Sequence, residues 1–291
     1  MRFIRPAAFW TLVSLLATAQ SVHSQESTTQ TIEFAKPDGV PLLLDLHIPS
    51  GVENPPLVMF IHGGGWRSGD RQRCRLRWLP KHGYAVASVE YRLSDEALFP
   101  AQIHDVKAAL RWLRARAEGY GYDASRVVVA GTSAGGHLAA LMGTSGDVSD
   151  LEGGVAGNLD QSSRVQGVID YYGPSDFVKR SENQKSKTDH PEGGVYQLLG
   201  GPVQENLEAA RLASPKTHLT KDDPPFLILH GDKDNTVYVD QSEWLEQSCQ
   251  EIGVEAHLEV MEGAGHGWKH NDREEQLVLT FLQKHLRPTH E

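Results

Sequence analysis

The chain has 291 residues and a formal net charge of −10 at pH 7. This length is enough for one α/β domain with a large core. The excess of acidic residues disfavours nucleic acid and anionic membrane surfaces as partners, because both repel a negatively charged protein.

The first 24 residues have the pattern of a secretory signal peptide. Arg2 and Arg5 form a positively charged start, and residues 7–19 are mostly apolar. Small residues then allow cleavage at the end of this run or after Ser24. The apolar run is shorter than the roughly 20 residues that a membrane-spanning helix needs. We therefore expect a secreted or periplasmic protein without stable membrane insertion.

The remaining residues, 25–291, are expected to form a single domain in which strands alternate with helices. Short apolar runs predict strands at 31–34, 41–48, 57–61, 84–89, 127–130, 165–172, 224–229 and 256–261. Helical patterns or compositions occur within 70–82 and at 101–118, 134–141, 239–251 and 273–286. The first two strands flank a P-D-G turn and predict an antiparallel hairpin. The alternation predicts a mostly parallel sheet with helices on both faces and ligands at the carboxyl ends of its strands.

One segment, about 173–220, does not fit this alternation. It is too long for an ordinary connection, and its middle reads S-E-N-Q-K-S-K-T-D-H. Such a segment predicts a small cap or lid over the site rather than a second domain.

Ser133 stands at the centre of the motif G-T-S-A-G, between an apolar strand and a helix-permissive run. This is the pattern of a nucleophile elbow, in which a serine sits on a sharp strand-to-helix turn. Small neighbours are needed because strand and helix approach closely there. The helix N-terminus behind the serine directs free N–H groups at the reaction centre.

A serine hydroxyl needs a base, and the base needs a carboxylate that orients it. In this type of fold the chain order is serine, acid, histidine. We expect Asp234 to be the acid, because it lies in H-G-D-K-D-N-T-V after an apolar strand, with Asp232 as the alternative. We expect His266, in the glycine-rich G-A-G-H-G-W, to be the base.

Three other histidines are expected to be structural. His62 and His230 directly follow strands, where they would hydrogen-bond backbone groups. His137 lies one helical turn after Ser133 on the same helix, which is a poor position for taking the serine proton.

The glycine run 63–65 follows a central strand and predicts an oxyanion-binding loop. Glycines let the backbone turn its N–H groups into a site and let substrate approach. The N–H of Ala134, next to the nucleophile, supplies a further donor. Neither Cys74 nor Cys249 has the spacing of a metal ligand, and we expect them on opposite faces of the sheet, too far apart for a disulfide.

Six motifs together resemble the α/β-hydrolase fold, more narrowly the hormone-sensitive-lipase-like esterases and particularly their bacterial acetyl-xylan and feruloyl esterase-like branch. They are H-G-G-G-W at 62–66, Y-R-L at 91–93, G-T-S-A-G-G-H at 131–137, Y-Y-G-P at 171–174, H-G-D-K-D-N-T-V at 230–237 and G-H-G-W at 265–268. The resemblance covers roughly residues 32–287.

The resemblance implies a catalytic triad of Ser133, Asp234 and His266. It implies oxyanion donors at Gly64, Gly65 and Ala134. It also implies a structural ion pair between Arg92 and Asp105. Trp66 and Trp268 would line the mouth of the site, where aromatic rings stack on sugars or ferulate, or else they serve packing alone.

These observations predict a secreted serine carboxylesterase that needs neither a metal nor an organic cofactor. Its substrate would be a small ester or an esterified polysaccharide with acetyl or feruloyl groups. The polar middle of the cap disfavours a long-chain lipase. Three alternatives remain: a prolyl-oligopeptidase-like peptidase, an arylformamidase, and a non-enzymatic binding protein, which would be expected to lack a triad member.

Overall fold

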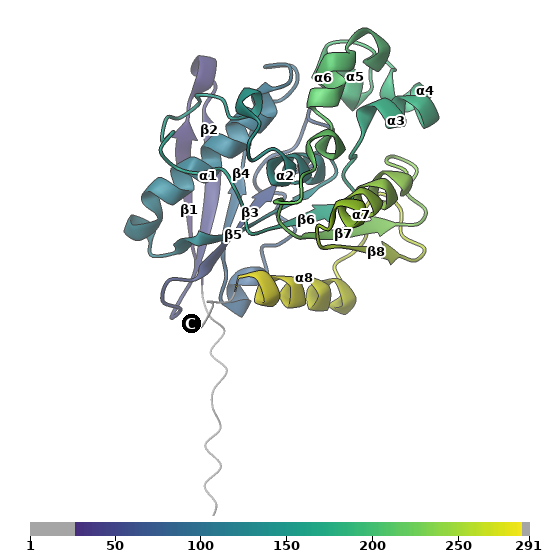
Figure 1. The fold of residues 1–291 in the computed structure, drawn as a ribbon. Coiled ribbons are helices and arrows are strands. Elements are labelled where there is room, and N and C mark those ends of the chain that lie inside the picture. The colour runs from purple at the N-terminus through teal and green to yellow at the C-terminus, as the bar shows by residue number, and fades with distance from the viewer. Residues whose placement is uncertain (1–26, 287–291) are drawn as a thin grey trace, which may run out of the picture.

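The computed structural model describes residues 27–286. Within this range, eight strands form one sheet in the order β1-β2-β4-β3-β5-β6-β7-β8 (Figure 1). The strands are β1 (Ser27–Ala35), β2 (Leu42–Pro49), β3 (Pro56–Ile61), β4 (Ala85–Val89), β5 (Asp123–Thr132), β6 (Gly167–Tyr171), β7 (Phe226–Gly231) and β8 (Ala256–Met261). β2 pairs antiparallel with β1 and with β4, and all other neighbours are parallel. The predicted hairpin and mostly parallel sheet are confirmed.

The central strands are mostly apolar because both faces of the sheet are covered. Successive side chains of a strand point to opposite faces. In β3, Leu57 and Met59 therefore join the core on one face, while Val58 and Phe60 join the core on the other. Their continuous burial explains why an unbroken apolar run marks a strand here.

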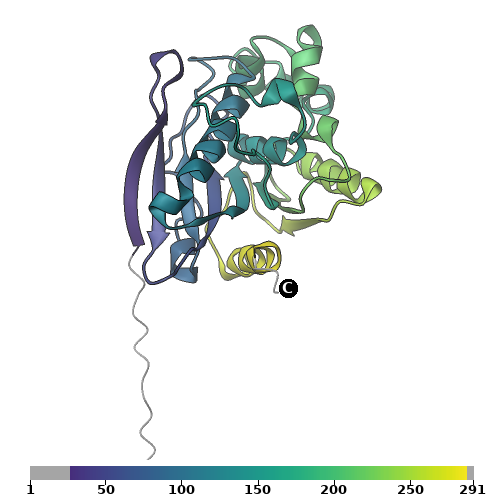
Figure 2. The same cartoon turned by 60° about the vertical axis from the view of Figure 1, so that its left-hand side comes forward.

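Helices cover both faces, as predicted. Three helices pack on one face: α1 (Ala101–Tyr120), α2 (Ala134–Thr144) and α7 (Asp240–Ile252). The last helix, α8 (Asp272–His285), packs on the other face, where it appears apart from the rest in Figures 1 and 2. Cys249 and Cys74 belong to these two separate cores, and both thiols are free.

The prediction of a helix within 70–82 is wrong. This segment consists of turns and one short 3₁₀ helix, η2 (Leu79–His82). Two of its arginines are held by partners distant in sequence instead of forming a helical face. Arg71 pairs with Asp45 and Glu90, and Arg75 pairs with Glu274 of α8. These tertiary ion pairs fix the segment as an irregular layer over the sheet.

The segment between β6 and β7, for which a cap is predicted, folds mainly into short helices and is called the cap below. Its four short helices gather at the end of the sheet where the parallel strands terminate (Figure 1). They are α3 (Phe177–Asn183), α4 (Lys185–Thr188), α5 (Gly194–Leu199) and α6 (Leu207–Leu212). Four further 3₁₀ helices are present among the described residues. η1 (Pro37–Gly39) and η3 (Ser149–Leu151) lie outside the cap, and η4 (Val203–Glu205) and η5 (Pro215–His218) lie between β6 and β7. That makes the cap a compact unit rather than an open loop.

Two sequence predictions concern export and membrane insertion. The expected signal peptide, residues 1–24, lies outside the described residues. Among residues 27–286, no helix is both long enough and apolar enough to span a membrane.

Candidate active site

Ser133 lies on the sharp turn that joins β5 to α2. Its backbone has a φ of 54° and a ψ of −115°, a conformation that side-chain-bearing residues rarely adopt. Two hydrogen bonds hold it: Ser133 N–H donates to Tyr171 O at 2.8 Å, and His137 N–H donates to Ser133 O at 2.9 Å. The strained turn presents the hydroxyl at the carboxyl end of β5.

The glycines around Ser133 are required by close backbone contacts. A Cβ on Gly131 would lie 2.1 Å from the carbonyl oxygen of Gly135. A Cβ on Gly135 would lie 2.1 Å from the carbonyl oxygen of Ile61, in β3. The G-x-S-x-G spacing is thus explained by the approach of α2 to β5 and β3.

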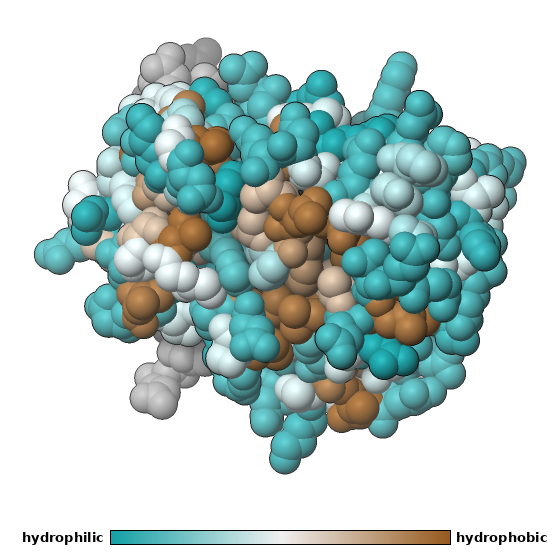
Figure 3. Space-filling model, turned by 90° about the horizontal axis from the view of Figure 1, so that it is seen from above, coloured by the Kyte–Doolittle hydropathy of each residue, from teal (hydrophilic) through white to brown (hydrophobic). Residues whose placement is uncertain are grey.

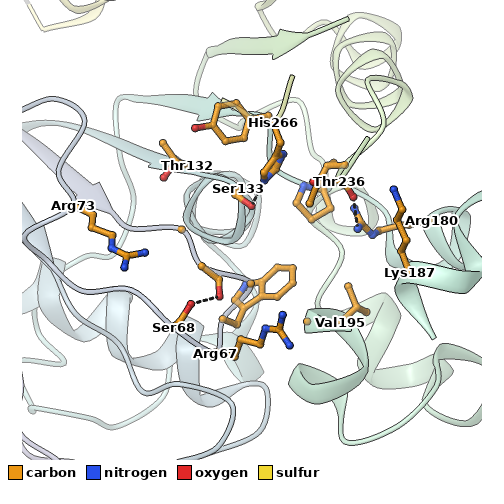
Figure 4. A pocket seen from close by; sticks show the side chains of 18 residues that line it. Arg67, Ser68, Arg73, Thr132, Ser133, Arg180, Lys187, Val195, Thr236 and His266 are labelled. Carbon is orange, nitrogen blue, oxygen red and sulfur yellow. Dashed lines mark hydrogen bonds between the residues drawn. The ribbon is translucent and has the colours of Figure 1, made fainter. Parts of the chain in front are cut away.

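The structure brings the three predicted triad residues into one hydrogen-bonded chain. His266 Nε2 lies 2.8 Å from Ser133 Oγ (Figure 4). His266 Nδ1 lies 2.6 Å from Asp234 Oδ2. An ionised carboxylate only accepts hydrogen bonds, so Nδ1 carries the proton and Nε2 accepts from the serine hydroxyl. In this tautomer His266 can take a proton from Ser133.

Asp234 is fully buried, and each of its oxygens has donors. Oδ1 accepts from the N–H groups of Thr236 and Val237, at 2.7 and 3.0 Å. Oδ2 faces His266 and also His230 Nε2, at 3.2 Å. Burial alone would raise the pKa of Asp234, but the hydrogen bonds from His230, His266 and the backbone lower it well below its usual range.

His230 therefore has a contact that sequence reasoning missed. Its Nε2 meets both Val237 O, the expected backbone partner, and Asp234 Oδ2. Its Nδ1 lies 2.7 Å from Ser242 Oγ. The only sequence signal for this contact is the four-residue spacing between His230 and Asp234 in H-G-D-K-D. The alternative acid, Asp232, instead accepts from Gly263 N–H at 2.6 Å.

The glycine loop after β3 lies beside Ser133. Gly64 and Gly65 have φ values of 118° and 63°, and both line the same pocket as the serine. A Cβ on Gly64 would lie 1.9 Å from Ser68 O, so only glycine fits. Ala134 is the first residue of α2, where a helix leaves its N–H groups without intrahelical acceptors. Backbone N–H groups from two elements are thus available near the serine.

The other two histidines expected to be structural have buried polar partners. His62 hydrogen-bonds Gly63 O at 2.8 Å and stacks on Tyr91, and burial lowers its pKa. His137 accepts from Trp66 Nε1 and contacts Ala213 O at 2.6 Å, and burial lowers its pKa to about 4. Both rings therefore stay neutral and join the elbow or glycine loop to surrounding backbone.

The two tryptophans are placed differently from one another. Trp66 borders the pocket but is only 4% exposed, and its ring packs edge-on against His137 and Phe177. Trp268 is not among the pocket-lining residues: its indole donates to Glu274 and its ring packs on Tyr172. Trp268 therefore does not line the pocket as expected, because Glu274 and the tyrosine rings hold its indole elsewhere.

The pocket above Ser133 holds about 500 Å³. Viewed from the cap end, hydrophobic residues gather along the centre of this face and hydrophilic ones surround them (Figure 3). Figure 4 shows Ser133 and His266 inside the pocket, with Arg180, Lys187 and Val195 contributed by the cap. The cap thus forms one wall of the site.

The implied ion pair between Arg92 and Asp105 is present and buried. Arg92 Nε and Nη2 donate to the two carboxylate oxygens of Asp105, at 2.9 and 2.8 Å. The Arg92 backbone N–H also donates to Asp105. Such a bidentate pair fixes the Y-R-L turn to α1, below the glycine loop.

Sequence comparison places the chain among proteins named esterases. The BD-FAE family model matches residues 44–249. Esterase LipC of Mycobacterium tuberculosis is 32% identical over 219 residues, which are 73% of this chain and 53% of LipC. The chain spans about half the length of the curated relatives it matches.

Solved structures that resemble this chain are also named as esterases. A bifunctional GH43-CE protein of Bacteroides eggerthii superposes with a TM-score of 0.80 at 32% identity, over 88% of this chain and 38% of the other. A truncated carbohydrate esterase from gut microbiota superposes with a TM-score of 0.79 at 29% identity, over 90% of this chain and 97% of the other. The fold of this chain is thus similar to that of carbohydrate esterases of known structure.

Proposed function

Because the chain belongs to the BD-FAE family and has the α/β-hydrolase fold, we propose that it is a secreted serine carboxylesterase. The observation that supports this most strongly is the hydrogen-bonded chain from Ser133 through His266 to Asp234 at the floor of a pocket. A strained nucleophile, a base in the useful tautomer and a buried acid are the parts that acyl transfer needs.

In the proposed reaction, Ser133 Oγ attacks the ester carbonyl carbon while His266 Nε2 takes the hydroxyl proton. Asp234 stabilises the imidazolium that forms and holds its tautomer. The tetrahedral intermediate collapses, and the same proton passes from Nε2 to the leaving alcohol. Water then attacks the acyl-enzyme, with His266 again taking a proton, and the carboxylic acid is released.

The negative oxygen of each tetrahedral intermediate needs donors. We assign the N–H groups of Gly64, Gly65 and Ala134 to this role, because they come from two elements that flank Ser133. Loss of one such donor typically lowers turnover by about 10²–10³. The positive φ of Gly64 and Gly65 turns this loop sharply, next to the first turn of α2.

Short-chain or aromatic esters, such as acetyl or feruloyl groups on plant polysaccharide, are the proposed substrates. Of the solved structures similar to this chain, one is named a bifunctional GH43-CE protein and another a carbohydrate esterase. The basic and polar side chains that the cap contributes to the pocket suit a sugar ester better than a long acyl chain. Export through the N-terminal signal would bring the enzyme to such a polymer.

Hydrolysis of an ester panel by the purified protein tests the proposal. The panel contains p-nitrophenyl acetate, butyrate and palmitate, methyl ferulate and acetylated xylan. Release of acetate or ferulate from the plant-type substrates, with little palmitate cleavage, is expected. Cleavage of a prolyl peptide or an aryl formamide with all esters left intact would replace the esterase proposal. Activity on nitrophenyl esters alone would remove its polysaccharide part.

The N-terminus of the secreted protein tests the export proposal separately. Mass spectrometry of protein recovered outside the cytoplasm should give a chain that starts at Gln20 or Gln25. An uncleaved chain retained in the cytoplasm would contradict the signal peptide and leave the esterase proposal standing.

A further inference from the structure

The pocket has the opposite charge balance from the chain as a whole. Its lining includes four basic side chains, Arg67, Arg73, Arg180 and Lys187, while no Asp or Glu is among the described residues that line it. The whole chain carries a net charge of −10. Concentrating positive charge in the one cleft that holds Ser133 creates a local field that attracts anions.

Arg180, on the cap helix α3, is the most unusual of the four. It is only 6% exposed, and its Nη2 donates to Thr236 O at 2.9 Å. Its Nε and Nη1 are buried and have no hydrogen-bond partner among the described residues. A buried donor without an acceptor is unfavourable, and more so when it is charged.

Arg180 keeps its charge at neutral pH. Burial lowers its pKa to about 10, while the more distant carboxylates of Asp234 and Asp240 act in the opposite direction. Neither acid forms a salt bridge with it in the described part of the chain. The guanidinium is therefore a buried cation in the wall of the pocket.

Lys187, on α4, adds a second cation to the same wall. Its Nζ donates to the carbonyl of Asn235 and lies 5.5 Å from the ring centroid of Tyr238, with no salt bridge between residues 27 and 286. Figure 4 shows Arg180 and Lys187 together on the cap side of the pocket, next to Thr236, and Arg73 on the other side of Ser133. The cap thus presents two neighbouring cations to a substrate bound at the serine.

We propose that the pocket selects esters that also carry a carboxylate, and that Arg180 and Lys187 bind this carboxylate. The inference rests on the proposed esterase function and names its substrate class. A carboxylate offers two acceptor oxygens and the negative charge that a guanidinium and an ammonium both attract. The carboxylate could belong to the alcohol side, as in an acetylated uronic acid, or to the acyl side, as in a dicarboxylic acid monoester.

Kinetics on matched ester pairs distinguish these two sources. The alcohol pair is O-acetylated methyl xyloside against O-acetylated methyl glucuronoside. The acyl pair is p-nitrophenyl butyrate against p-nitrophenyl hemisuccinate. For one of the pairs, the wild-type kcat/KM for the anionic member should exceed that for the neutral member by about 10- to 100-fold, the scale of a charged hydrogen bond. The preference should shrink as salt is added. Equal or lower values for both anionic members would overturn the inference.

Arg180→Gln tests the residue itself, and Lys179→Gln is the matched control. Lys179 lies next to Arg180 on α3, is half-exposed and pairs with Glu182. Arg180→Gln should raise KM for the preferred anionic ester at least ~10-fold more than KM for the neutral ester, whereas Lys179→Gln should change neither. A fall in kcat for both esters at constant KM would instead make Arg180 a positioning residue for the Thr236 turn, and would overturn the inference. If Arg180→Gln does not fold, Lys187→Gln should give the same selective rise in KM.

A binding measurement separates this inference from the proposed function. Ser133→Ala protein is titrated calorimetrically with methyl glucuronoside and succinate, and with methyl xyloside as the neutral control. Saturable binding of either anionic probe alone, weakened by the Lys187→Gln change, is expected. Binding without ester hydrolysis by the wild-type protein would contradict the esterase proposal only. Hydrolysis without any anion preference, and no binding, would contradict the inference only.

Discussion

The two oxygens of Asp234 are held by four groups from three directions. Backbone N–H groups fix Oδ1, and the imidazoles of His266 and His230 contact Oδ2. The carboxylate is therefore ionised and immobile, which is what orientation of His266 requires. Asp232, two residues earlier, reaches only the turn at Gly263.

Exchange of these two acids for amides should have very different effects. Asp234→Asn should lower kcat by about 10⁴-fold, because an amide disturbs the tautomer of His266. Asp232→Asn should stay within a few-fold of wild type, since its contact is exposed and remote from Ser133. Initial rates on p-nitrophenyl acetate measure both. A larger loss in Asp232→Asn would show that the acid is assigned wrongly.

Ser133 and His266 should also behave as one unit. Each single alanine variant should lose nearly all activity, and the double variant should be little worse, because neither group works without the other. The comparison is made on kcat with one ester. Losses that multiply in the double variant would argue that His266 is not the base.

The hydrogen-bonded chain of Ser133, His266 and Asp234 was predictable because its signals are local: a serine between small residues, then an acid and a histidine each after a strand. The roles of His230 and Arg180 were not. His230 reaches Asp234 only because the turn after β7 folds back over the ring. Arg180 lies in a polar stretch whose burial depends on how the cap packs.

At the scale of elements, the site depends on how closely α2 approaches β3 and β5. Gly135 allows this approach, because any side chain would meet Ile61 O at 2.1 Å. Strands were predicted well for a related reason: both faces of each central strand are buried, so the apolar run is continuous. The segment 70–82 was predicted wrongly as a helix, since its arginines pair across the fold and not along it.

Two glycine-to-alanine changes distinguish the steric effect of this close approach from the effect of helix propensity on stability. Gly135→Ala should abolish activity, because α2 must move and carry Ser133 with it. Gly119→Ala, on α1 with no atom within 4 Å of an added Cβ, should raise stability by about 0.5–1 kcal/mol. Urea unfolding and ester hydrolysis are measured on both variants. Full activity in Gly135→Ala would contradict the tight elbow.

Asp170, at the end of β6, is a buried carboxyl that makes stability depend on pH. Its Oδ1 accepts from Gly173 N–H at 2.8 Å, while Oδ2 has no partner among the described residues. Burial raises its pKa to about 6, although the Gly173 hydrogen bond and His230 oppose this. The folded state therefore holds this proton more tightly than the unfolded state. As the pH rises from about 4 to about 6, the contribution of Asp170 to the free energy of unfolding decreases.

Asp170→Asn removes that titration and keeps the acceptor for Gly173. Relative to wild type, the variant should therefore gain stability as the pH rises from about 4 to about 6, and the difference should be constant above that. Urea unfolding at a series of pH values gives both curves. A difference that is constant over the whole range would mean that Asp170 does not titrate there.

At the scale of the whole molecule, distant parts of the chain are joined by buried charges. Arg75, in the layer after the glycine loop, forms a two-bond ion pair with Glu274 of α8, whose side chain is 0% exposed. Arg75 also stacks over Trp268, close to the loop that carries His266. Such a link is invisible in the sequence, because its partners are 199 residues apart.

Arg75→Met should destabilise the protein by about 3–5 kcal/mol, since it leaves the buried Glu274 carboxylate without its partner. The matched control is Arg273→Gln, next to Glu274 on the same helix, whose pair with Glu259 is exposed. This control should change the unfolding midpoint little. Equal midpoints for the two variants would contradict a structural role for the buried pair.

Covalent labelling with a fluorophosphonate tests the central claim most directly, because it asks whether Ser133 is an activated nucleophile without any assumption about the substrate. Intact mass and peptide mapping should show one adduct on Ser133 in the wild-type protein. The adduct should be absent in Ser133→Ala and form far more slowly in His266→Ala. An unlabelled wild-type protein, or an adduct on another serine, would contradict the account.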